Sequence, residues 1–295
     1  MVSILGRYEL TLENGSVRID LGKGHKVLCT YPGDGEYNNV RSIGIGTVGC
    51  DVDLPLSDHN LQCYWAEMSF GKTCGAAVAI ADLRGGIGRA GSEGTGGKGE
   101  ISLILILTPD FSISSMARGG ITAVEAISAT IQDLRLRDAL GNAGSGSINL
   151  SMAVVSDPES ELRLRGTGKH SKMGEIIGKT VYDAVRGSAE KNGIRINDSP
   201  ISFLNSIGYT KERITKELGI SEKRYSDIAE RIEKDARLKA GFSALILLND
   251  EIEWGLIPTE AGEKAGLRII DTLCGSHADC GKRLMDSFVK TVFGS

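Results

Sequence analysis

The residues best suited to do chemistry lie in a glycine-rich turn at residues 166–174, which reads Gly-Thr-Gly-Lys-His-Ser-Lys-Met-Gly. This turn places His170 just ahead of a segment whose apolar spacing predicts a helix over residues 171–192. The positive end of a helix dipole disfavours a protonated imidazole, so His170 should be neutral near pH 7. A neutral imidazole can accept a proton as a general base. The alternative is that His170 only caps the helix and that the glycines serve packing.

Two glycines on the predicted helix, Gly174 and Gly178, are four residues apart. Residues at this spacing lie on one face of a helix, so the pair should leave a flat groove that accepts another backbone. Gly193 follows the helix, where a C-terminal glycine cap belongs.

The segments before this turn indicate a mixed α/β fold. Alternating or apolar runs predict strands over residues 8–12, 16–21, 26–31, 40–48, 61–70, 76–83, 101–108 and 148–155. The run at 101–107 is almost wholly apolar, so this strand should be buried on both faces and helices should cover the sheet. Apolar residues spaced by three and four, from Val124 to Leu134, predict one such helix over residues 122–140. These elements predict a layered α–β sandwich whose strand order stays open.

The composition changes near residue 195, where glycine becomes rarer and charge density rises. We therefore predict two domains, residues 1–195 and residues 196–295. In the second domain, the sequence predicts helices over 201–207, 210–218 and 221–240, a β-hairpin of 242–248 with 251–257, and helices after Pro258 and after Ala278. Helices followed by a hairpin are typical of a winged-helix arrangement.

The turn that carries His170 also resembles a signature of the adenosylcobinamide amidohydrolases, the CbiZ family of corrinoid salvage. That family carries Gly-x-His-x-x-x-Gly-Glu-x-Ile-Gly at the start of a helix, and residues 168–178 fit the pattern. The resemblance extends over about residues 75–192, with the family's segments in the same order. Three other family motifs are matched more weakly. The Gly-Thr-Ile-Asn strand corresponds to residues 96–107, with Ser102 at the Asn position, and the Thr-Glu-Ala-Lys segment corresponds to 121–134, with Glu125 kept and Ile127 in place of Lys. The Thr-Gly-Thr-Gly-Thr-Asp turn corresponds to 144–149, with Asn149 in place of Asp.

The resemblance implies hydrolysis of one amide, which would cut adenosylcobinamide to adenosylcobyric acid and aminopropanol in cobalamin biosynthesis. Such a reaction needs a base, hydrogen-bond donors for the oxyanion, and an acid for the leaving amine. His170 would serve as base and then as acid, and Glu125 would orient it or activate water. The remaining residues assigned to the site are Gly144, Ser145, Gly146 and Ser147 as the oxyanion cradle, Lys169 or Lys172 for the developing charge, and Asn149, Arg84 and Arg89 for substrate binding.

Several of these residues have a plainer interpretation. Thr122 and Glu125 match a capping box, in which the Glu125 carboxylate would only satisfy backbone N–H groups at the helix start. The turn at residues 144–147 would then merely join a helix to a strand. Ser145 or Ser147 acting as a covalent nucleophile is a further alternative, although no Gly-x-Ser-x-Gly elbow surrounds either serine.

The sequence predicts no cofactor, because the corrinoid is the substrate in this interpretation. Zinc is an alternative at Cys274, His277 and Cys280, although a fourth ligand is not evident. Residues 86–91 match the Gly-x-Gly-x-x-Gly pattern of dinucleotide-binding proteins without the helix that should follow it. His25 is isolated in the sequence, and we expect it to have a surface or capping role.

Charge and composition restrict the partners. The chain has 34 Lys and Arg against 38 Asp and Glu, with 5% aromatic residues, so neither its field nor base stacking favours nucleic acid. Residues 209–240 carry nine basic and seven acidic residues, a net of +2, which is low for a DNA-reading face. The alternative function is a corrinoid-binding or corrinoid-sensing regulator without turnover. The sequence has no membrane-spanning run or signal peptide, which predicts a cytoplasmic protein whose oligomeric state is open, a homo-oligomer included.

Overall fold

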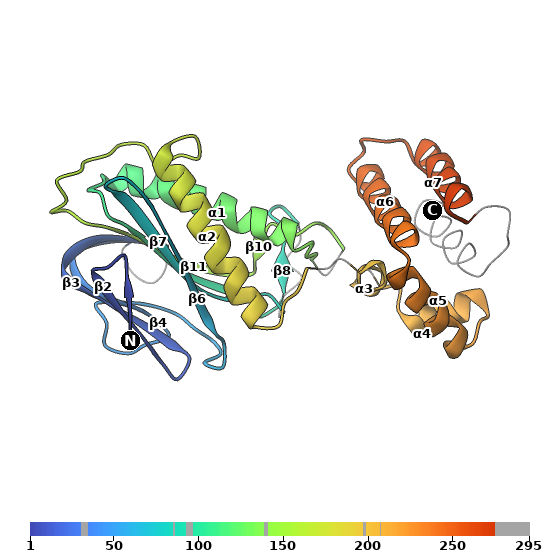
Figure 1. Cartoon of the computed structure of the whole chain (residues 1–295), viewed down its shortest axis with the longest axis horizontal. Helices are drawn as coiled ribbons and strands as arrows, with labels where there is room; N and C mark the ends of the chain where they lie inside the picture. Colours follow the sequence, from blue (N-terminus) through green and yellow to red (C-terminus); the bar gives the residue numbers. More distant parts are fainter. Residues whose placement is uncertain are drawn as a thin grey trace. The chain divides into compact units, whose positions relative to one another are not determined.

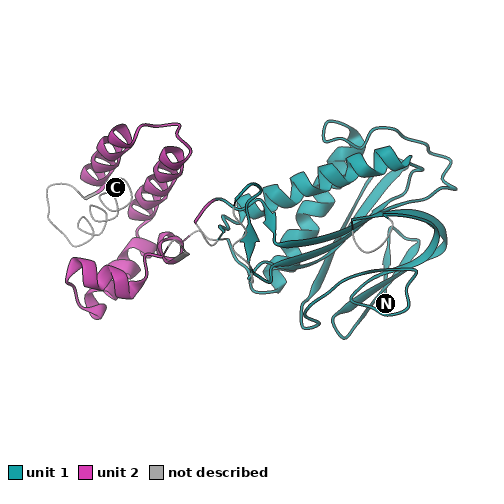
Figure 2. Cartoon of the chain, turned by 180° about the vertical axis from the view of Figure 1, so that it is seen from behind, with its two compact units in different colours: residues 1–139, 143–196 teal, residues 140–142, 197–295 magenta. Residues whose placement is uncertain are grey.

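The computed structural model describes residues 1–30, 35–84, 86–92, 97–138, 141–196, 199–206 and 208–274. The chain divides into two compact units (Figure 2). Unit 1 comprises Met1–Ala139 and Ala143–Ile196, and unit 2 comprises Leu140–Asn142 and Asn197–Ser295. Each unit has an apolar core of its own.

Unit 1 is built on one mixed sheet with two helices packed on it (Figure 1). The strands of this sheet are β1 (Val2–Ile4), β2 (Tyr8–Glu13), β3 (Ser16–Cys29), β4 (Glu36–Ile45), β5 (Val52–Leu54), β6 (Cys63–Phe70), β7 (Thr73–Asp82), β9 (Glu100–Leu107) and β11 (Asn149–Ser156). Their order is β1–β2–β3–β11–β9–β7–β6, and β4 pairs with both β3 and β5. A small second ladder joins β8 (Ile87–Gly88) to β10 (Gly146–Ser147). The predicted mixed α/β class is confirmed.

The two helices of unit 1 follow the parallel strands. α1 (Ile113–Asp133) connects β9 to the segment before β11, and α2 (Lys172–Lys191) follows β11. Both helices lie on the same face of the sheet (Figure 1), because their apolar residues join one core cluster with that face.

β9 is buried along its whole length, as its apolar run predicts. Leu103 and Leu105 belong to the core cluster beneath α1 and α2. Ile104 and Ile106, which alternate with them, belong to a second cluster built with β1 to β5. Helices therefore cover only one face of the sheet. The expectation of helical cover is wrong for the other face, which is covered by strands.

The second β layer forms because β3 is long and bends. Residues 16–20 pair with β2 and residues 26–29 pair with β11, while β4 pairs with both halves of β3. Its pairing with β4 shifts register after Asp20, and Gly22 adopts φ +72°, a conformation that L side chains rarely adopt. The two strands predicted at 16–21 and 26–31 are therefore one bent strand that passes between the layers.

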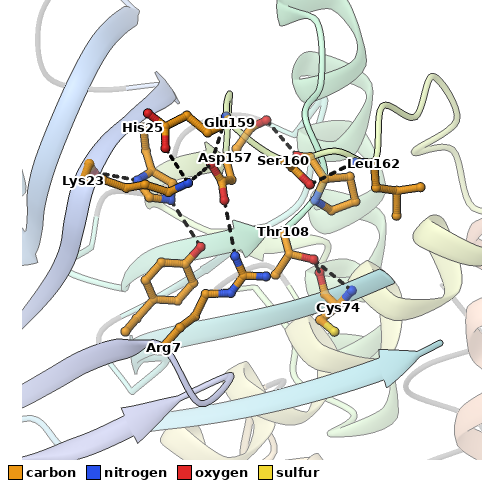
Figure 3. A network of polar contacts seen from close by, with 12 residues as sticks. Arg7, Lys23, His25, Cys74, Thr108, Asp157, Glu159, Ser160 and Leu162 are labelled. Carbon is orange, nitrogen blue, oxygen red and sulfur yellow. Dashed lines mark hydrogen bonds and ion pairs between the residues drawn. The ribbon is translucent and has the colours of Figure 1, made fainter. Parts of the chain in front are cut away.

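A polar network with buried His25 and Asp157 at its centre lies at this bend (Figure 3). His25 is 0% exposed, with Nε2 3.2 Å from the Tyr8 hydroxyl and Nδ1 2.8 Å from the Lys23 carbonyl oxygen. Asp157 follows β11, is 2% exposed, and pairs with Arg7 at 3.3 Å and Lys23 at 3.0 Å. The expectation of a surface or capping role for His25 is wrong, because the ring is enclosed where the bend of β3 meets the end of β11.

We expect this network to make unit 1 less stable at acid pH. Burial lowers the pKa of His25. Burial acts to raise the pKa of Asp157, but its hydrogen bond to Lys23 and the backbone N–H of Glu159 lower that pKa overall. A group whose pKa is lower in the folded chain stabilises the fold above its unfolded pKa, and this stability is lost as the pH falls. The loss should begin below 6.5 for His25 and below 3.8 for Asp157, their ordinary pKa values.

Denaturant unfolding at several pH values checks this expectation. The free energy of unfolding should decline from about pH 6.5 to pH 5, with His25 contributing at most about 1.4 kcal/mol per pH unit. His25→Gln has no titrating ring and should flatten the decline. An equally steep decline in this variant would assign the pH dependence to other groups.

The regular secondary structure among the described residues of unit 2 is all helical. Its helices are α3 (Pro200–Ser206), α4 (Lys211–Leu218), α5 (Glu222–Lys234), α6 (Ala236–Glu253) and α7 (Thr259–Cys274). The buried residues of their core are Phe203, Leu204, Ile214, Tyr225, Ile228, Ile232, Leu238, Phe242, Leu245, Ile246, Leu248 and Ile270. The predicted helical C-terminal unit is confirmed.

The β-hairpin predicted at residues 242–257 is wrong, because most of that stretch belongs to α6. The buried residues Leu238, Phe242 and Leu245 are spaced by four and three, which is the helical period. Residues 249–250, which the sequence analysis assigned to a turn, lie inside the helix. Unit 2 therefore has no wing among its described residues, and the winged-helix arrangement is wrong there.

The last helix predicted in unit 2, after Ala278, lies outside the described residues. Among the helices that are described, none has the length and apolarity needed to cross a bilayer.

Candidate functional site

α1 starts earlier than predicted, which changes the interpretation of Glu125. Ser112 caps the helix, and its side chain accepts a hydrogen bond from the Ser115 N–H at 3.3 Å. Thr122 and Glu125 therefore lie in the helix interior, and the capping-box alternative is wrong. The Thr122 hydroxyl instead donates to the Thr167 carbonyl at 3.0 Å. The Glu125 carboxylate is available for other contacts.

α2 is capped by Ser171 and not by His170. The Ser171 hydroxyl oxygen accepts from the Gly174 N–H at 3.0 Å, and the hydroxyl donates to the Gly168 carbonyl at 2.8 Å. The capping alternative for His170 is therefore wrong. Because Ser171 satisfies the helix start, the imidazole one residue earlier is not needed there.

Gly174 lets this turn pass directly over the first turn of α2. A Cβ at Gly174 would meet the Gly168 carbonyl oxygen and would lie 2.9 Å from the Lys169 Cα. The groove predicted at Gly174 and Gly178 is thus filled at its first glycine by the chain's own backbone. A Cβ at Gly178 would meet nothing within 4 Å, so the groove is open there.

His170 lines a cleft of about 720 Å³ between α1 and the turn. The other residues of this His170 cleft are Arg118, Ile121, Thr122, Glu125, Gly166, Gly168, Lys169 and Ser171. Lys169 Nζ lies 3.0 Å from Glu125 Oε1. The His170 imidazole is exposed and has no hydrogen-bond partner among the described residues. The structure brings His170, Glu125 and Lys169 together and adds Arg118, which the sequence analysis missed.

A groove of about 410 Å³ continues from the His170 cleft along both helices. This α1–α2 groove shares Thr122, Glu125 and Lys169 with the cleft. Its small lining residues are Ala126, Ala129, Gly174 and Gly178, and its larger ones are Glu175, Lys179, Tyr182 and Asp183. A ligand bound beside His170 therefore has a shallow extension with small side chains available to it.

The two serines of the turn at residues 144–147 have local partners. The Ser145 hydroxyl oxygen accepts from the Ala90 N–H at 2.8 Å. The Ser147 hydroxyl donates to the Asn149 carbonyl at 2.6 Å. Neither serine is among the described residues that line the His170 cleft, so the structure does not place the predicted oxyanion cradle beside the imidazole.

The other predicted binding residues also lie apart from His170. Their contacts are the Gly144 N–H to the Leu136 carbonyl at 3.0 Å, Gly146 to Gly88 in the β10–β8 ladder, Arg84 to Asp82 at 3.0 Å, and Arg89 to the Ala143 carbonyl at 3.0 Å.

Asn149 lines a different cleft, on the opposite face of the sheet. By strand register, Asp82, Glu100 and Asn149 form one row across β7, β9 and β11. Their side chains share the face of Ile104, which packs against the second β layer and not against the helices. The loop after β5 completes this sheet-edge cleft, which has a volume of about 940 Å³.

The two clefts also lie toward opposite ends of the sheet. Met173, in the first turn of α2, has its Cε 3.1 Å from where a Cβ on Gly75 would stand, and Gly75 pairs with Leu107 at the end of β9. The sheet-edge cleft lies at Glu100, where β9 begins. The strand between them is about 23 Å long. The residues predicted for one site are therefore not brought together in one place.

Glu100 and Ser151 are candidate functional residues that the sequence analysis missed. Glu100 is 6% exposed and accepts hydrogen bonds from the Ser57 N–H, at 3.0 Å, and from the Ser57 hydroxyl. A signal was present in the sequence. Both parallel strands begin with polar residues at alternate positions, Glu100 with Ser102 and Asn149 with Ser151, which places four polar side chains on one face.

Metal ligands are not grouped in the described part of the chain, where no three His, Cys, Asp or Glu side chains are placed to hold an ion. The zinc alternative depends on His277 and Cys280, which lie outside the described residues. Ile127, at the position where the family carries Lys, is 1% exposed and packs in the core.

The comparisons with known proteins agree with the resemblance of the turn. No curated protein matches the chain. The model of the CbiZ family, described as adenosylcobinamide amidohydrolase, matches residues 62–196. The matched segment runs from β6 to the end of α2 and contains both His170 and Glu125. Residues 62–196 of this chain are therefore similar to the CbiZ family of adenosylcobinamide amidohydrolases.

Proposed function

We propose that unit 1 hydrolyses the amide that links aminopropanol to the corrin ring of adenosylcobinamide, giving adenosylcobyric acid in corrinoid salvage. The family match supports an amidohydrolase of this kind. The observation that carries the proposal is the His170 cleft. The His170 imidazole does not cap a helix and has no hydrogen-bond partner among the described residues. It lines this cleft together with the Glu125–Lys169 pair.

In the proposed reaction, His170 removes a proton from water as the water oxygen attacks the amide carbon. The carbonyl π electrons move to oxygen, and the tetrahedral intermediate carries one negative charge. Arg118 and Lys169 line the same cleft and supply positive charge for this oxyanion. His170 then returns its proton to the amide nitrogen, the C–N bond breaks, and neutral aminopropanol leaves.

Glu125 has a supporting role in this scheme. Its carboxylate holds the Lys169 ammonium at 3.0 Å, and both side chains are about half exposed. The pair is therefore a positioning contact and contributes little to the stability of the fold. Placing Lys169 near the reacting carbonyl is the role that we propose for Glu125.

Water is the nucleophile that the geometry favours over serine. Ser145 and Ser147 both use their hydroxyl groups in local hydrogen bonds, and neither lines the His170 cleft among the described residues. The Ser171 hydroxyl does line the cleft, but it is engaged in capping α2. A direct attack by water needs no hydroxyl group from the protein.

We place the corrin ring over the α1–α2 groove. A flat macrocycle needs a surface without projecting side chains, and Gly178 lines this groove at a point where a Cβ would meet nothing within 4 Å. The groove is continuous with the His170 cleft, so a ring that lies there can present one side-arm amide to the imidazole. In this placement, binding of the corrin ring in the groove positions its side-arm amide for cleavage beside His170.

Mass detection of aminopropanol released from adenosylcobinamide tests the proposal. The full chain should release one aminopropanol for each adenosylcobinamide consumed, at the same rate with and without a metal chelator. Binding of the corrinoid without any release would contradict the proposal in favour of a non-catalytic corrinoid-binding protein. Loss of release in chelator would contradict the metal-free mechanism.

A further inference from the structure

The sheet-edge cleft carries a charge arrangement that the proposed hydrolysis does not use. Asp82 and Glu100 are directly opposite each other on the antiparallel strands β7 and β9, and a third carboxylate, Asp58, lines the same cleft. Like charges that face each other across a strand pair destabilise a sheet. Asp82 is balanced in part by Arg84 at 3.0 Å, and within the described part of the chain Glu100 receives neutral donors alone, from Ser57.

Two polar side chains in this cleft have no hydrogen-bond partner among the residues that the structure describes. Ser151 is 8% exposed and lines the cleft, yet its hydroxyl has no hydrogen-bond partner among the described residues. The Asn149 side chain, which lies in one row with Glu100, has none in the described part of the chain either. Because Ser151 lines the cleft and its hydroxyl has no protein partner in the described part of the chain, it marks a position where a bound molecule can supply a hydrogen bond.

The net negative charge of the sheet-edge cleft favours a cationic ligand. Among the described residues, three carboxylates and the Lys98 ammonium line the cleft, and the Arg84 guanidinium pairs with Asp82, which gives a formal charge of −1 (−3 and +2). A metal ion is not the favoured cation, because the described residues hold no group of three or more ligands placed to bind one. An organic ammonium group is larger and can bridge carboxylates that are too far apart to share a metal ion.

We propose that the sheet-edge cleft binds a small amino alcohol. Its ammonium group lies between Asp82 and Glu100, and its hydroxyl group exchanges hydrogen bonds with Ser151 and Asn149. The ammonium relieves the repulsion between the paired carboxylates, and the hydroxyl gives Ser151 a hydrogen-bond partner. The inference does not depend on the proposed hydrolysis, although the aminopropanol that such a reaction releases belongs to this class of ligand.

Calorimetric titration of the full chain with 1-amino-2-propanol tests the site without any corrinoid. Binding should be saturable and at least about tenfold tighter than that of 1,2-propanediol, which keeps the hydroxyl and lacks the charge. Glu100→Gln should weaken it by about tenfold or more. Ser151→Ala should weaken it several-fold and should leave the binding of isopropylamine, which has no hydroxyl, unchanged.

A control variant outside the cleft tests whether the loss of binding is specific to the sheet-edge cleft. Glu9→Gln removes an exposed carboxylate from β2, outside the cleft, and should leave binding unchanged. Equal binding of 1,2-propanediol, equal weakening by Glu9→Gln, or displacement of the amine by equimolar Mg²⁺ would each overturn the proposal. The thermal midpoint of each variant shows whether it is folded. If Glu100→Gln does not fold, Ser151→Ala, which only removes a hydroxyl group, decides the result.

Discussion

Replacing His170 with alanine is expected to reduce the rate of aminopropanol release by about 10²-fold or more, because the reaction loses its general base and its general acid together. The thermal midpoint should hardly change. The side chain is exposed, has no hydrogen-bond partner among the described residues, and is not the cap of α2. The two measurements therefore separate a chemical role from a structural one, since only the first should respond.

Glu125→Gln is the companion variant for this experiment. Glu125 lies in the interior of α1 and its side chain is 46% exposed, so glutamine should fit without loss of stability. Release should slow by about tenfold, because the ion pair that positions Lys169 is weakened. Full activity in His170→Ala would show that the base lies elsewhere and would end the proposal for this cleft. Full activity in Glu125→Gln would remove only the positioning role.

Alanine at Gly174 and at Gly178 should have opposite effects on stability. The added methyl group at Gly174 would collide with the Gly168 carbonyl oxygen and with the backbone of Lys169. The turn must then move, which should cost about 1–3 kcal/mol of stability and displace His170. We therefore expect Gly174→Ala to lose most of its activity together with several degrees of its thermal midpoint.

Gly178→Ala is the matched control on the same helix. Its methyl group would meet no protein atom within 4 Å, and alanine in a helix interior is favoured over glycine by about 1 kcal/mol. The thermal midpoint should rise. If the corrin ring lies in the α1–α2 groove, KM for adenosylcobinamide should rise as well, and Gly178→Leu should enlarge this effect. A KM that is unchanged in both Gly178 variants would remove the ring from the groove and leave the His170 cleft in place.

The sequence predicted the elements whose pattern is local. β9 is a run of apolar residues, and α2 has a clear apolar spacing, a polar cap and a glycine after its end, so both were predicted close to their observed bounds. α1 was predicted to start at residue 122, nine residues late, because Gly119 and Gly120 interrupt its first half. These glycines lie within the helix, where α1 packs closely on α2 and β11.

Features that depend on contacts between distant segments were not predicted. α6 was assigned to a hairpin because its apolar run and its Asn-Asp pair also suit a strand and a turn, and only packing in unit 2 decides between them. The bend of β3 and the burial of His25 likewise depend on a second β layer that no local pattern reveals.

The residues of the candidate site were likewise predicted only in part. His170, Lys169 and Glu125 were predicted together, and the structure places them in one cleft. Asn149 was assigned to the same site from a motif, but the direction of β11 carries it to the other end of the sheet. Strand direction and the face on which each residue lies follow from the sheet topology, which the sequence left open.

The position of the two clefts on opposite faces of one sheet has a consequence for occupancy. The His170 cleft and the sheet-edge cleft share no lining residue among the described residues. The strands β7, β9 and β11, with close-packed apolar side chains on both faces, separate the two clefts. A molecule in one cleft takes no space from a molecule in the other, so both can be filled at once without steric competition. Binding in one cleft would have to affect binding in the other through a small shift of these strands along or across the sheet.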